Sequence, residues 1–186
     1  MSQKLSSTLD DHELVRHAKL GDRNAFSELV QQHRAGVINL IYRICGDGQI
    51  AEDAAQNAFI QAWQNLNQYK PKYAFRSWIY RIAANAAIDL LRREVDSLDI
   101  DGIQLPSKTV RPEASVENDE RSAQIQNAVL ALPYASRVVL ILREYEGLSY
   151  RQISETLEIP LGTVMSRLNY ARNLLRKELA PLVEER

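Results

Sequence analysis

Apolar residues recur at intervals of three and four along most of the chain, and this spacing restricts the fold more than any other feature of the sequence. It gathers apolar side chains on one face of a helix, where they can form a core. The clearest stripe contains Phe26, Leu29, Val30, Val37, Ile38 and Ile41. The alternation of β-branched and polar residues that is typical of strands is missing. The sequence therefore predicts an all-α protein.

Helix start and stop signals divide this pattern into eight predicted helices, with Gly21, Gly46 and Pro71 ending the first three. In the N-terminal half the predicted helices cover about residues 11–19, 24–45, 51–69 and 74–93. In the C-terminal half they are a helix through Leu130 that ends near Pro133, then about 136–145, 149–157 and 162 to beyond 179. The pattern predicts two helical domains.

The chain of 186 residues has a formal net charge of only −1, but its charges are segregated. Residues 68–93 contain six basic residues and one acidic residue, and residues 161–177 contain four basic residues and no acidic one. Between them, residues 94–120 contain eight acidic and two basic residues, together with prolines, serines and a glycine. This composition predicts a flexible acidic linker between two basic segments.

The predicted domains cover residues 1–94 and 118–186, and the predicted linker covers residues 95–117. Each domain carries one of the two basic segments. Basic surfaces bind nucleic acid through its phosphates, and phosphates repel an acidic linker. The organisation therefore suits binding to two separated patches of one DNA duplex.

The C-terminal domain contains a predicted helix-turn-helix. Ser149 and Gln152 have the spacing of a capping box, which begins a short helix that runs to residue 157. A turn at residues 158–160 leads into the last helix. Its apolar residues fall on one face, namely Val164, Leu168, Ala171 and Leu175. The rest of the helix is available to contact DNA, although two short core helices would give the same spacing.

The sequence lacks the residue groupings that metal binding, disulfide formation and nucleophilic catalysis require. Cys45 is the single cysteine, and its apolar neighbours predict a buried structural thiol. His12, His17 and His33 lack the spacing of a zinc site, and no grouping for nucleophilic catalysis is present. We expect no cofactor, no metal and no enzymatic activity. The chain also has no apolar segment long enough for a membrane span or a signal peptide, which predicts a cytoplasmic protein without membrane insertion.

Several separate segments resemble one family. GLSYRQI (147–153) and IPLGTVMSRL (159–168) resemble region 4 of the extracytoplasmic-function (ECF) sigma factors of the sigma-70 family. AEDAAQNAFIQAW (51–63) is similar to region 2.2 of that family, and FRSWIYRIAAN (75–85) to its regions 2.3 and 2.4. Their order and spacing also agree. The resemblance implies an alternative sigma factor, which directs bacterial core RNA polymerase to chosen promoters and has no catalytic residues of its own.

The resemblance implies that the third predicted helix docks on the β' clamp helices of core RNA polymerase, with the β flap as a further contact of the protein. The candidate docking residues are Asp53, Gln56 and Asn57. Their spacing gives them a common face, while Phe59 and Trp63 are expected to face the core. A solvated helix face is the competing interpretation. Asn57 stands where the family usually has an acidic residue.

For the −10 promoter element, the resemblance implies that a flipped base is held beside residues 69–85. Aromatic and basic residues alternate there, as strand opening requires. Tyr69 would stack on the base and Asn85 would bind its edge, whereas Trp78 and Ile82 are expected to pack inward. The cations expected on the DNA backbone are Lys70, Lys72, Arg76 and Arg81.

For the −35 element, the resemblance implies that the last helix enters the major groove. The candidate contacts are Thr163, Met165, Ser166, Arg167, Asn169, Tyr170 and Arg172. Asn169 can pair both of its amide groups with adenine. Met165 and Tyr170 stand where relatives often carry basic residues. A solvated charge is the competing interpretation for Arg172.

Two other functions are compatible with the helical pattern. A freestanding helix-turn-helix regulator would bind DNA without polymerase, but such regulators usually dimerise on palindromic sites and do not need the aromatic and basic block at residues 69–81. A protein-binding adaptor would need neither basic surface. The resemblance also implies a dedicated anti-sigma factor as a partner, together with core polymerase and promoter DNA.

Overall fold

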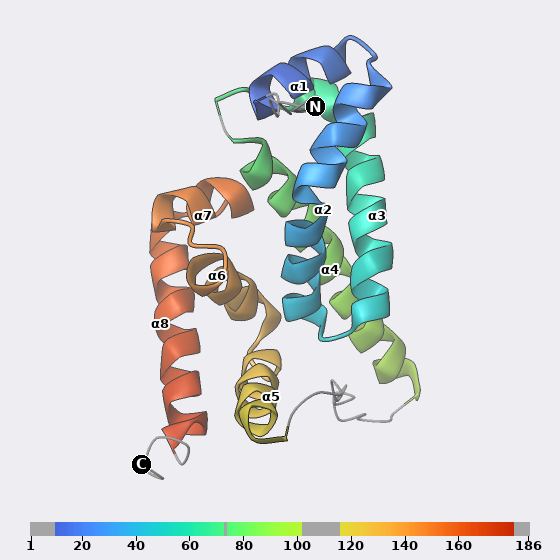
Figure 1. Cartoon of the computed structure of the whole chain (residues 1–186). Coiled ribbons are helices and arrows are strands. Elements are labelled where there is room, and N and C mark those ends of the chain that lie inside the picture. The colour runs from blue at the N-terminus through green and yellow to red at the C-terminus, as the bar shows by residue number, and fades with distance from the viewer. Residues whose placement is uncertain (1–9, 73, 102–115, 181–186) are drawn as a thin grey trace, which may run out of the picture.

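The computed structural model describes residues 10–72, 74–101 and 116–180. Every regular element within these ranges is a helix, which confirms the predicted all-α class. Figure 1 shows the helices arranged as two groups that lie side by side. The first group comes from the N-terminal half of the chain and the second from the C-terminal half.

The N-terminal group is built around one long helix. Its elements are α1 (Asp11–Lys19), α2 (Arg23–Cys45), α3 (Gly48–Gln64), the 3-10 helix η1 (Leu66–Gln68) and α4 (Phe75–Asp101). Helix α2 contacts α1, α3 and α4. The side chain of Asp22 caps α2 by accepting from the backbone N–H of Asn24 at 2.9 Å, and Asp47 caps α3 by accepting from that of Ile50 at 2.9 Å. Asp22 thus lies at the turn between α1 and α2, whereas the Asp47 cap and Gly46, at φ +81°, fix the turn between α2 and α3.

Small residues set the distance between α3 and its neighbours. The buried side chains of α3 are Ala51, Ala54, Ala55, Ala58, Phe59 and Ala62. Alanine lets helix backbones approach closely, so α3 fits against both α2 and α4. Its polar residues are thereby left on the outer side of the group.

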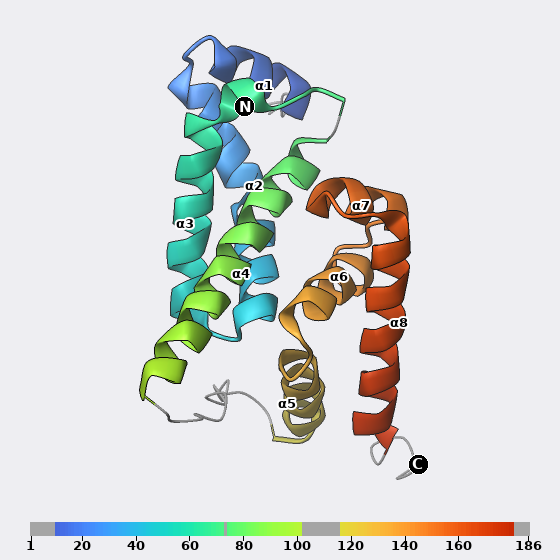
Figure 2. The ribbon, with the colours of Figure 1, turned by 180° about the vertical axis from the view of Figure 1, so that it is seen from behind.

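The C-terminal group contains α5 (Val116–Leu130), α6 (Tyr134–Glu144), α7 (Tyr150–Leu157) and α8 (Leu161–Glu178). Figure 2 shows α8 along the outer side of this group, with α7 at its upper end. Helix α6 lies at the centre and contacts α5, α7 and α8. Ile141 and Leu142 of α6 are fully buried, and Leu168 of α8 is 1% exposed. This packing fixes the position of the helix-turn-helix.

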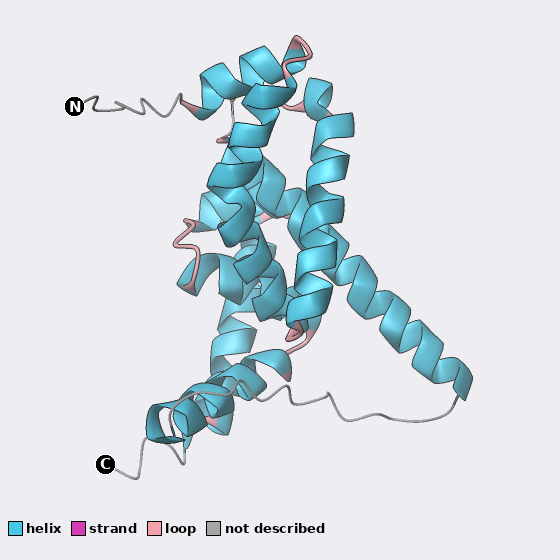
Figure 3. Cartoon of the chain, turned by 45° about the vertical axis from the view of Figure 1, so that its right-hand side comes forward, coloured by secondary structure: helices cyan, strands magenta, loops and turns pink. Residues whose placement is uncertain are grey.

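Two predicted boundaries are wrong. Helix α3 ends at Gln64 rather than near residue 69, because the chain continues as the short helix η1 before Tyr69. Helix α4 continues to Asp101, whereas the sequence predicts its end near residue 93. Figure 3 shows the last turns of α4 leaving the helix group. The first part of the predicted linker is therefore helical, and residues 102–115 lie outside the described ranges.

The two groups share one apolar core, in which α2 and α4 contact α6 while α7 packs on α4. Arg137 of α6 supplies the polar part of this junction. Its guanidinium donates to the carbonyl oxygen of Ile44 at the end of α2, and also to those of Leu130 and, at 2.9 Å, Leu132. Burial lowers the pKa of Arg137. A desolvated arginine thus ties the C-terminal group to the end of α2.

Candidate polymerase and nucleic-acid interfaces

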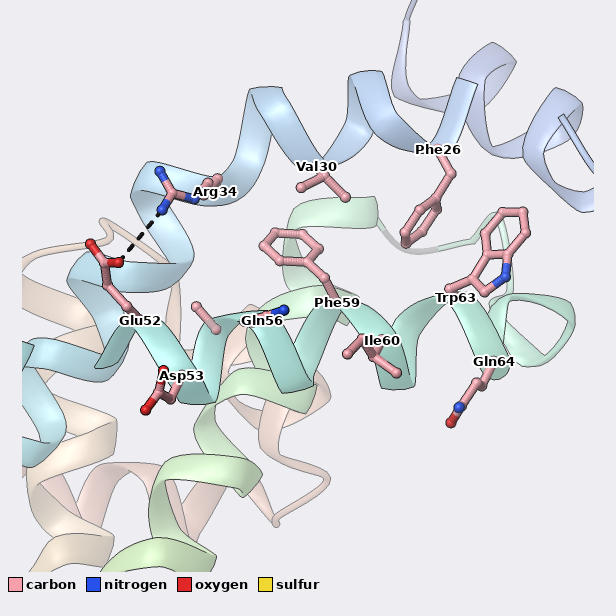
Figure 4. Close-up of a pocket in the computed structure, with 11 residues that line it drawn as sticks. Phe26, Val30, Arg34, Glu52, Asp53, Gln56, Phe59, Ile60, Trp63 and Gln64 are labelled. Carbon is pink, nitrogen blue, oxygen red and sulfur yellow. Dashed lines mark ion pairs between the residues drawn. The ribbon is translucent and has the colours of Figure 1, made fainter. Parts of the chain in front are cut away.

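The outer face of α3 carries the three candidate polymerase-docking residues. Asp53, Gln56 and Asn57 are all exposed, while Ala55 and Phe59 of the same helix are buried. The predicted division of α3 into a core face and a polar face is therefore present. Figure 4 shows Asp53 on the side of α3 that is turned away from α2.

An apolar groove lies beside this face, between α2 and α3 (Figure 4). Phe26 and Val30 come from α2, and Trp63 comes from α3. The rings of Phe26 and Trp63 have centroids 4.9 Å apart, and the Arg34–Glu52 ion pair, at 3.8 Å, lies at one end. Asp53, Gln56 and the half-exposed Ile60 also line the groove. The candidate polar residues and an open apolar surface thus lie together.

Sequence reasoning missed this groove because it assigned Phe26, Val30 and Trp63 to the core. Leu29, Val37 and Ile41 of the predicted stripe are fully buried, but Phe26 and Val30 are only partly covered. Trp63, expected to face the core, is also partly covered. Helical spacing identifies an apolar face but not the width of the neighbour that covers it.

Tyr69, the candidate for base stacking, is buried in this structure and only 2% of it is exposed. Its ring lies in an aromatic cluster, 5.9 Å from that of Phe75 and 5.4 Å from that of Trp78. Lys19 of α1 donates to its backbone carbonyl at 2.8 Å. Burial raises the pKa of Tyr69, and the charges of Asp11 and Asp10 add to this. In this conformation the ring presents no face to a base.

The other residues of the −10 block have different surroundings. Trp78 is buried, as predicted, and Ile82 packs against the core. Lys70 and Lys72 are exposed and line a cleft between α4 and α7. Asn85 of α4 is exposed.

Both arginines of this block contact carboxylates of the C-terminal group. Arg76 donates to the carboxylate of Glu146 at 2.7 Å, and the hydroxyl of Tyr80 donates to the same oxygen at 2.9 Å. Arg81 is ion-paired with Glu158. Burial alone would lower the pKa of Arg76, but its hydrogen bonds with Tyr80 and Glu146 outweigh burial and raise the pKa. Two of the four cations predicted for DNA phosphate, Arg76 and Arg81, are therefore already paired within the chain.

The helix-turn-helix has the predicted local geometry. Ser149 accepts from the backbone N–H of Gln152 at 3.2 Å, and the Gln152 side chain accepts from that of Ser149 at 2.8 Å, so the capping box is confirmed. The turn places Glu158 at φ +53°. On α8 the predicted apolar face consists of Val164, Leu168 and Ala171, all buried, and the partly buried Leu175.

The opposite side of α8 is open. Met165 and Tyr170 are 47% and 51% exposed, and Ser166 and Asn169 are also exposed. The backbone carbonyl oxygen of Thr163 accepts a hydrogen bond from the hydroxyl of Ser166 at 3.1 Å. Thr163 and Arg167 are half-buried at the edge of this face.

Arg172 is exposed and has two partners within the C-terminal group. It donates to Glu144 of α6 at 2.7 Å and to the hydroxyl of Tyr150 at 3.3 Å. These two hydrogen bonds raise the pKa of Arg172, and the bond with Glu144 has the larger effect. The sequence identified Arg172 but gave no sign of Glu144, because the two residues lie on different helices.

Other kinds of site find little support in the described residues. Within residues 10–72, 74–101 and 116–180, no three histidine, cysteine or acidic side chains are grouped so that they could bind a metal ion. No helix in these ranges has the length and apolar character needed to cross a membrane.

Comparisons with known proteins assign each half of the chain to a known region of one family. Residues 29–96 match the family model of sigma-70 region 2, and residues 122–175 match that of sigma-70 region 4. The first match includes α3 and the motif at residues 75–85 of α4. The second match includes the helix-turn-helix formed by α7 and α8.

Relatives match over nearly the whole chain. The RNA polymerase sigma-H factor of Pseudomonas aeruginosa is 37% identical, over 94% of this chain and 96% of that protein. The ECF RNA polymerase sigma factor SigW of Bacillus subtilis is 35% identical, over 90% and 96%. The ECF RNA polymerase sigma-E factor of Escherichia coli is 32% identical, over 96% and 99%.

Solved structures show the same fold. The sigma factor RpoE from Bartonella quintana, solved with the anti-sigma factor NepR, superposes with a TM-score of 0.70 at 22% identity, over 83% of this chain and 96% of that one. CnrH, solved with the cytosolic domain of CnrY, superposes with a TM-score of 0.69 at 25% identity, over 92% and 97%.

These matches define a sigma-70 family protein with regions 2 and 4. The chain belongs to the ECF sigma factors of that family, and it is an alternative sigma factor that acts in transcription initiation rather than a freestanding regulator. Proteins of this family are initiation factors without catalysis of their own.

Proposed function

We propose that three surfaces of this sigma factor divide the work of promoter recognition. The exposed face of α3 docks on core RNA polymerase, the start of α4 and the segment before it bind the −10 element, and α8 binds the −35 element. The observation that carries the proposal is that most motif residues of α3 and α8 lie on the exposed faces of helices whose opposite faces are buried. Such faces are available to partners without unfolding.

On α3, Asp53, Gln56 and Asn57 supply the polar contacts to the β' clamp helices. The adjacent groove of Phe26, Trp63 and their neighbours supports this assignment, because stable interfaces combine an apolar centre with a polar rim. A solvated helix face would not need the groove. The β flap is a further proposed contact, made by the C-terminal group.

On the −10 side, Lys70, Lys72, Arg76 and Arg81 bind the DNA backbone and Asn85 binds a base edge. Their exposure supports this for the two lysines and Asn85. Tyr69 stacks on a flipped base only if its aromatic cluster opens, because its ring is buried. The basic residues would hold a displaced strand by its phosphates.

On the −35 side, α8 enters the major groove with its first turns against base edges. Asn169 is placed to read adenine, with Thr163, Met165, Ser166 and Tyr170 beside it and Arg167 and Arg172 toward phosphate. The exposure of five of these side chains supports the proposal. We propose that the protein works in the cytoplasm, where polymerase and promoters are, and that an anti-sigma protein inhibits it.

The decisive experiment uses purified core RNA polymerase and a promoter selected by the assembled complex. The chain should form a one-to-one complex with core and support promoter-specific transcription. Asp53→Lys reverses a charge at the docking face and should weaken core binding at least about tenfold, because a like charge at an interface is costly. Glu13→Lys, an equal change on an exposed residue of α1, should leave core binding unchanged.

Failure of the wild-type chain to bind core, or initiation no better than by core alone, contradicts the proposed function. Equal effects of Asp53→Lys and Glu13→Lys contradict the assignment of α3 as the docking face.

A further inference from the structure

The last residue of α1 contacts the segment where the −10 block begins. Helix α1 packs on α2 and also on η1 (Figure 1). From its end, the Lys19 ammonium donates to the backbone carbonyl of Tyr69 at 2.8 Å and lies 5.6 Å from the centroid of the Tyr69 ring. The hydrogen bond is partly buried and joins residues 50 positions apart. A charged donor makes a stronger hydrogen bond than a neutral one, so Lys19 holds the main chain of Tyr69 in place.

Helix α1 is itself fixed to the rest of the N-terminal group. At its start, the carboxylate of Asp11 lies 3.0 Å from Nε2 of His33 on α2, and only 14% of the His33 side chain is exposed. The centroid of the His33 ring lies 5.3 Å from that of Phe75, the first residue of α4. Between its two ends α1 buries Leu14, Val15 and Ala18. Because α1 is fixed in this way, Lys19 ties Tyr69 to the body of the domain.

The position of Tyr69 determines where the two lysines of the −10 block lie. Lys70 and Lys72 follow it directly, and both are exposed. Pro71 between them fixes its own φ and disfavours the helical conformation at Lys70, so this stretch of main chain is stiff. The fully buried ring of Phe75 fixes the start of α4. The segment between η1 and α4 is thus held at both ends, and the proposed contacts to the DNA backbone lie between them.

Lys19 bonds to the main chain of Tyr69, which is compatible with movement of the ring. A rotation about the Cα–Cβ bond can carry the ring out of its cluster with Phe75 and Trp78 while the carbonyl oxygen stays on Lys19. A ring that turns on a fixed main chain loses less conformational entropy on binding a base than a ring on a loose segment. The bond from Lys19 therefore favours base stacking by Tyr69.

We propose that Lys19 is a positioning residue for −10 recognition, which fixes the main chain at Tyr69 so that residues 69–72 are preorganised to bind the displaced strand. Lys19 itself does not contact DNA. This inference rests on the proposed −10 surface. Loss of the Lys19 bond leaves every proposed DNA contact in the chain, but it lowers the fraction of molecules in which the segment is correctly placed. The affinity for the −10 strand falls with that fraction.

The test compares variants of the full chain, each in complex with core RNA polymerase. Lys19→Met removes the donor and keeps an apolar stem, Lys19→Gln keeps a donor on a shorter side chain, and Lys19→Arg keeps a charged donor of similar reach. Arg16→Met is the matched control, because Arg16 is an exposed cation of the same helix. Fluorescence anisotropy over a range of salt measures binding of the labelled non-template strand of the −10 region, and of a duplex that carries the −35 element alone.

We expect Lys19→Met and Lys19→Gln to bind the −10 strand about fivefold more weakly than the wild type. Lys19→Arg and Arg16→Met should bind it like the wild type, and all four variants should bind core polymerase and the −35 duplex normally. The slope of log affinity against log salt should be the same for Lys19→Met and the wild type, because no contact to phosphate is lost. Loss of a phosphate contact would make that slope shallower by about 0.7.

Unchanged binding of the −10 strand by Lys19→Met overturns the inference, and so does tighter binding, because Lys19 would then hold the Tyr69 ring in its buried position. A shallower salt slope overturns it as well, since Lys19 would itself contact phosphate. A loss shared with the −35 duplex, or one that Lys19→Arg does not restore, reduces the effect to a general fold defect. If the wild-type complex binds the −10 strand and Lys19→Met binds it equally well, the inference alone fails. If the wild-type complex does not bind that strand, the proposed function fails.

Discussion

The two candidate DNA surfaces of this sigma factor differ in what they contact within the chain. On α8, Asn169 and Tyr170 are exposed. On α4, Arg76 and Arg81 are paired with carboxylates of the other domain. Both surfaces come from basic segments of the sequence. A basic segment therefore predicts where cations lie along the chain, but not whether those cations are available.

The difference follows from how each surface is placed. Helix α8 lies on the outer side of its group, with its apolar face on α6. The start of α4 lies at the junction, where α7 packs against it. The junction also contains Arg137, which binds three backbone carbonyls from α2, α5 and the turn that follows α5. Whatever opens the −10 surface must disturb this junction, whereas the −35 surface needs no such change.

The largest effect is expected from Arg137→Met, which tests whether the two groups form one unit. The substitution leaves three partly buried carbonyl oxygens without their donor and should lower the free energy of unfolding by about 3 kcal/mol. Both tryptophans, Trp63 and Trp78, lie in the N-terminal half, so tryptophan fluorescence in urea reports on that half. A shifted midpoint in that signal shows that α6 stabilises the N-terminal group.

Arg151→Met is the matched control, because the Arg151 side chain is 87% exposed and its ion pair with Glu155 joins neighbouring turns of α7. It should change the free energy of unfolding by less than about 0.5 kcal/mol. Tryptophan unfolding that is the same for Arg137→Met and the wild type would mean that the groups are independent, and the contrast between open and closed surfaces would then lose its structural basis.

The next effect concerns α8 and should leave stability unchanged. Asn169→Ala removes a side chain that is exposed in the free protein, so the free energy of unfolding should stay within about 0.5 kcal/mol of the wild type. Binding of the polymerase complex to its promoter should weaken about tenfold if Asn169 pairs with adenine. Gel-shift titration at fixed salt measures this.

Asn173→Ala makes the same change one turn farther along α8, where the residue is also exposed. Because the first turns of a recognition helix meet the bases, it should have little effect. Equal losses from both substitutions would show a general effect on α8 rather than base reading.

The contrast also marks how far the sequence predicts this structure. The capping box at Ser149 and the buried face of α8 at Leu168 were predictable, because both depend on residues three or four positions apart. The contact between Arg76 and Glu146 was not, since it joins residues 70 positions apart, one on α4 and one in the loop between α6 and α7. Local patterns define faces, and only packing decides which faces meet.

The same limit explains Tyr69 and the groove on α3. Tyr69 follows the short helix η1, which the sequence did not predict, and that turn brings its ring against Phe75 and Trp78. Phe26 and Trp63 belong to helical stripes that predicted burial, yet α2 and α3 leave them partly open. The motif positions were identified through family likeness, whereas their surroundings required the fold.

The smallest effect is expected from Glu144→Gln, which asks whether Arg172 belongs with the open surface or with the paired one. Arg172 donates to Glu144 at 2.7 Å, and both side chains are nearly half exposed, so the pair adds little to stability. The substitution releases Arg172. If the released side chain reaches phosphate, promoter affinity should rise by about a factor of two, and the slope of log affinity against log salt should steepen by about 0.9. An unchanged slope would instead assign Arg172 to holding α8 against α6. In that case the −35 surface, like the −10 surface, would contain a cation whose partner is another helix of the same chain rather than DNA.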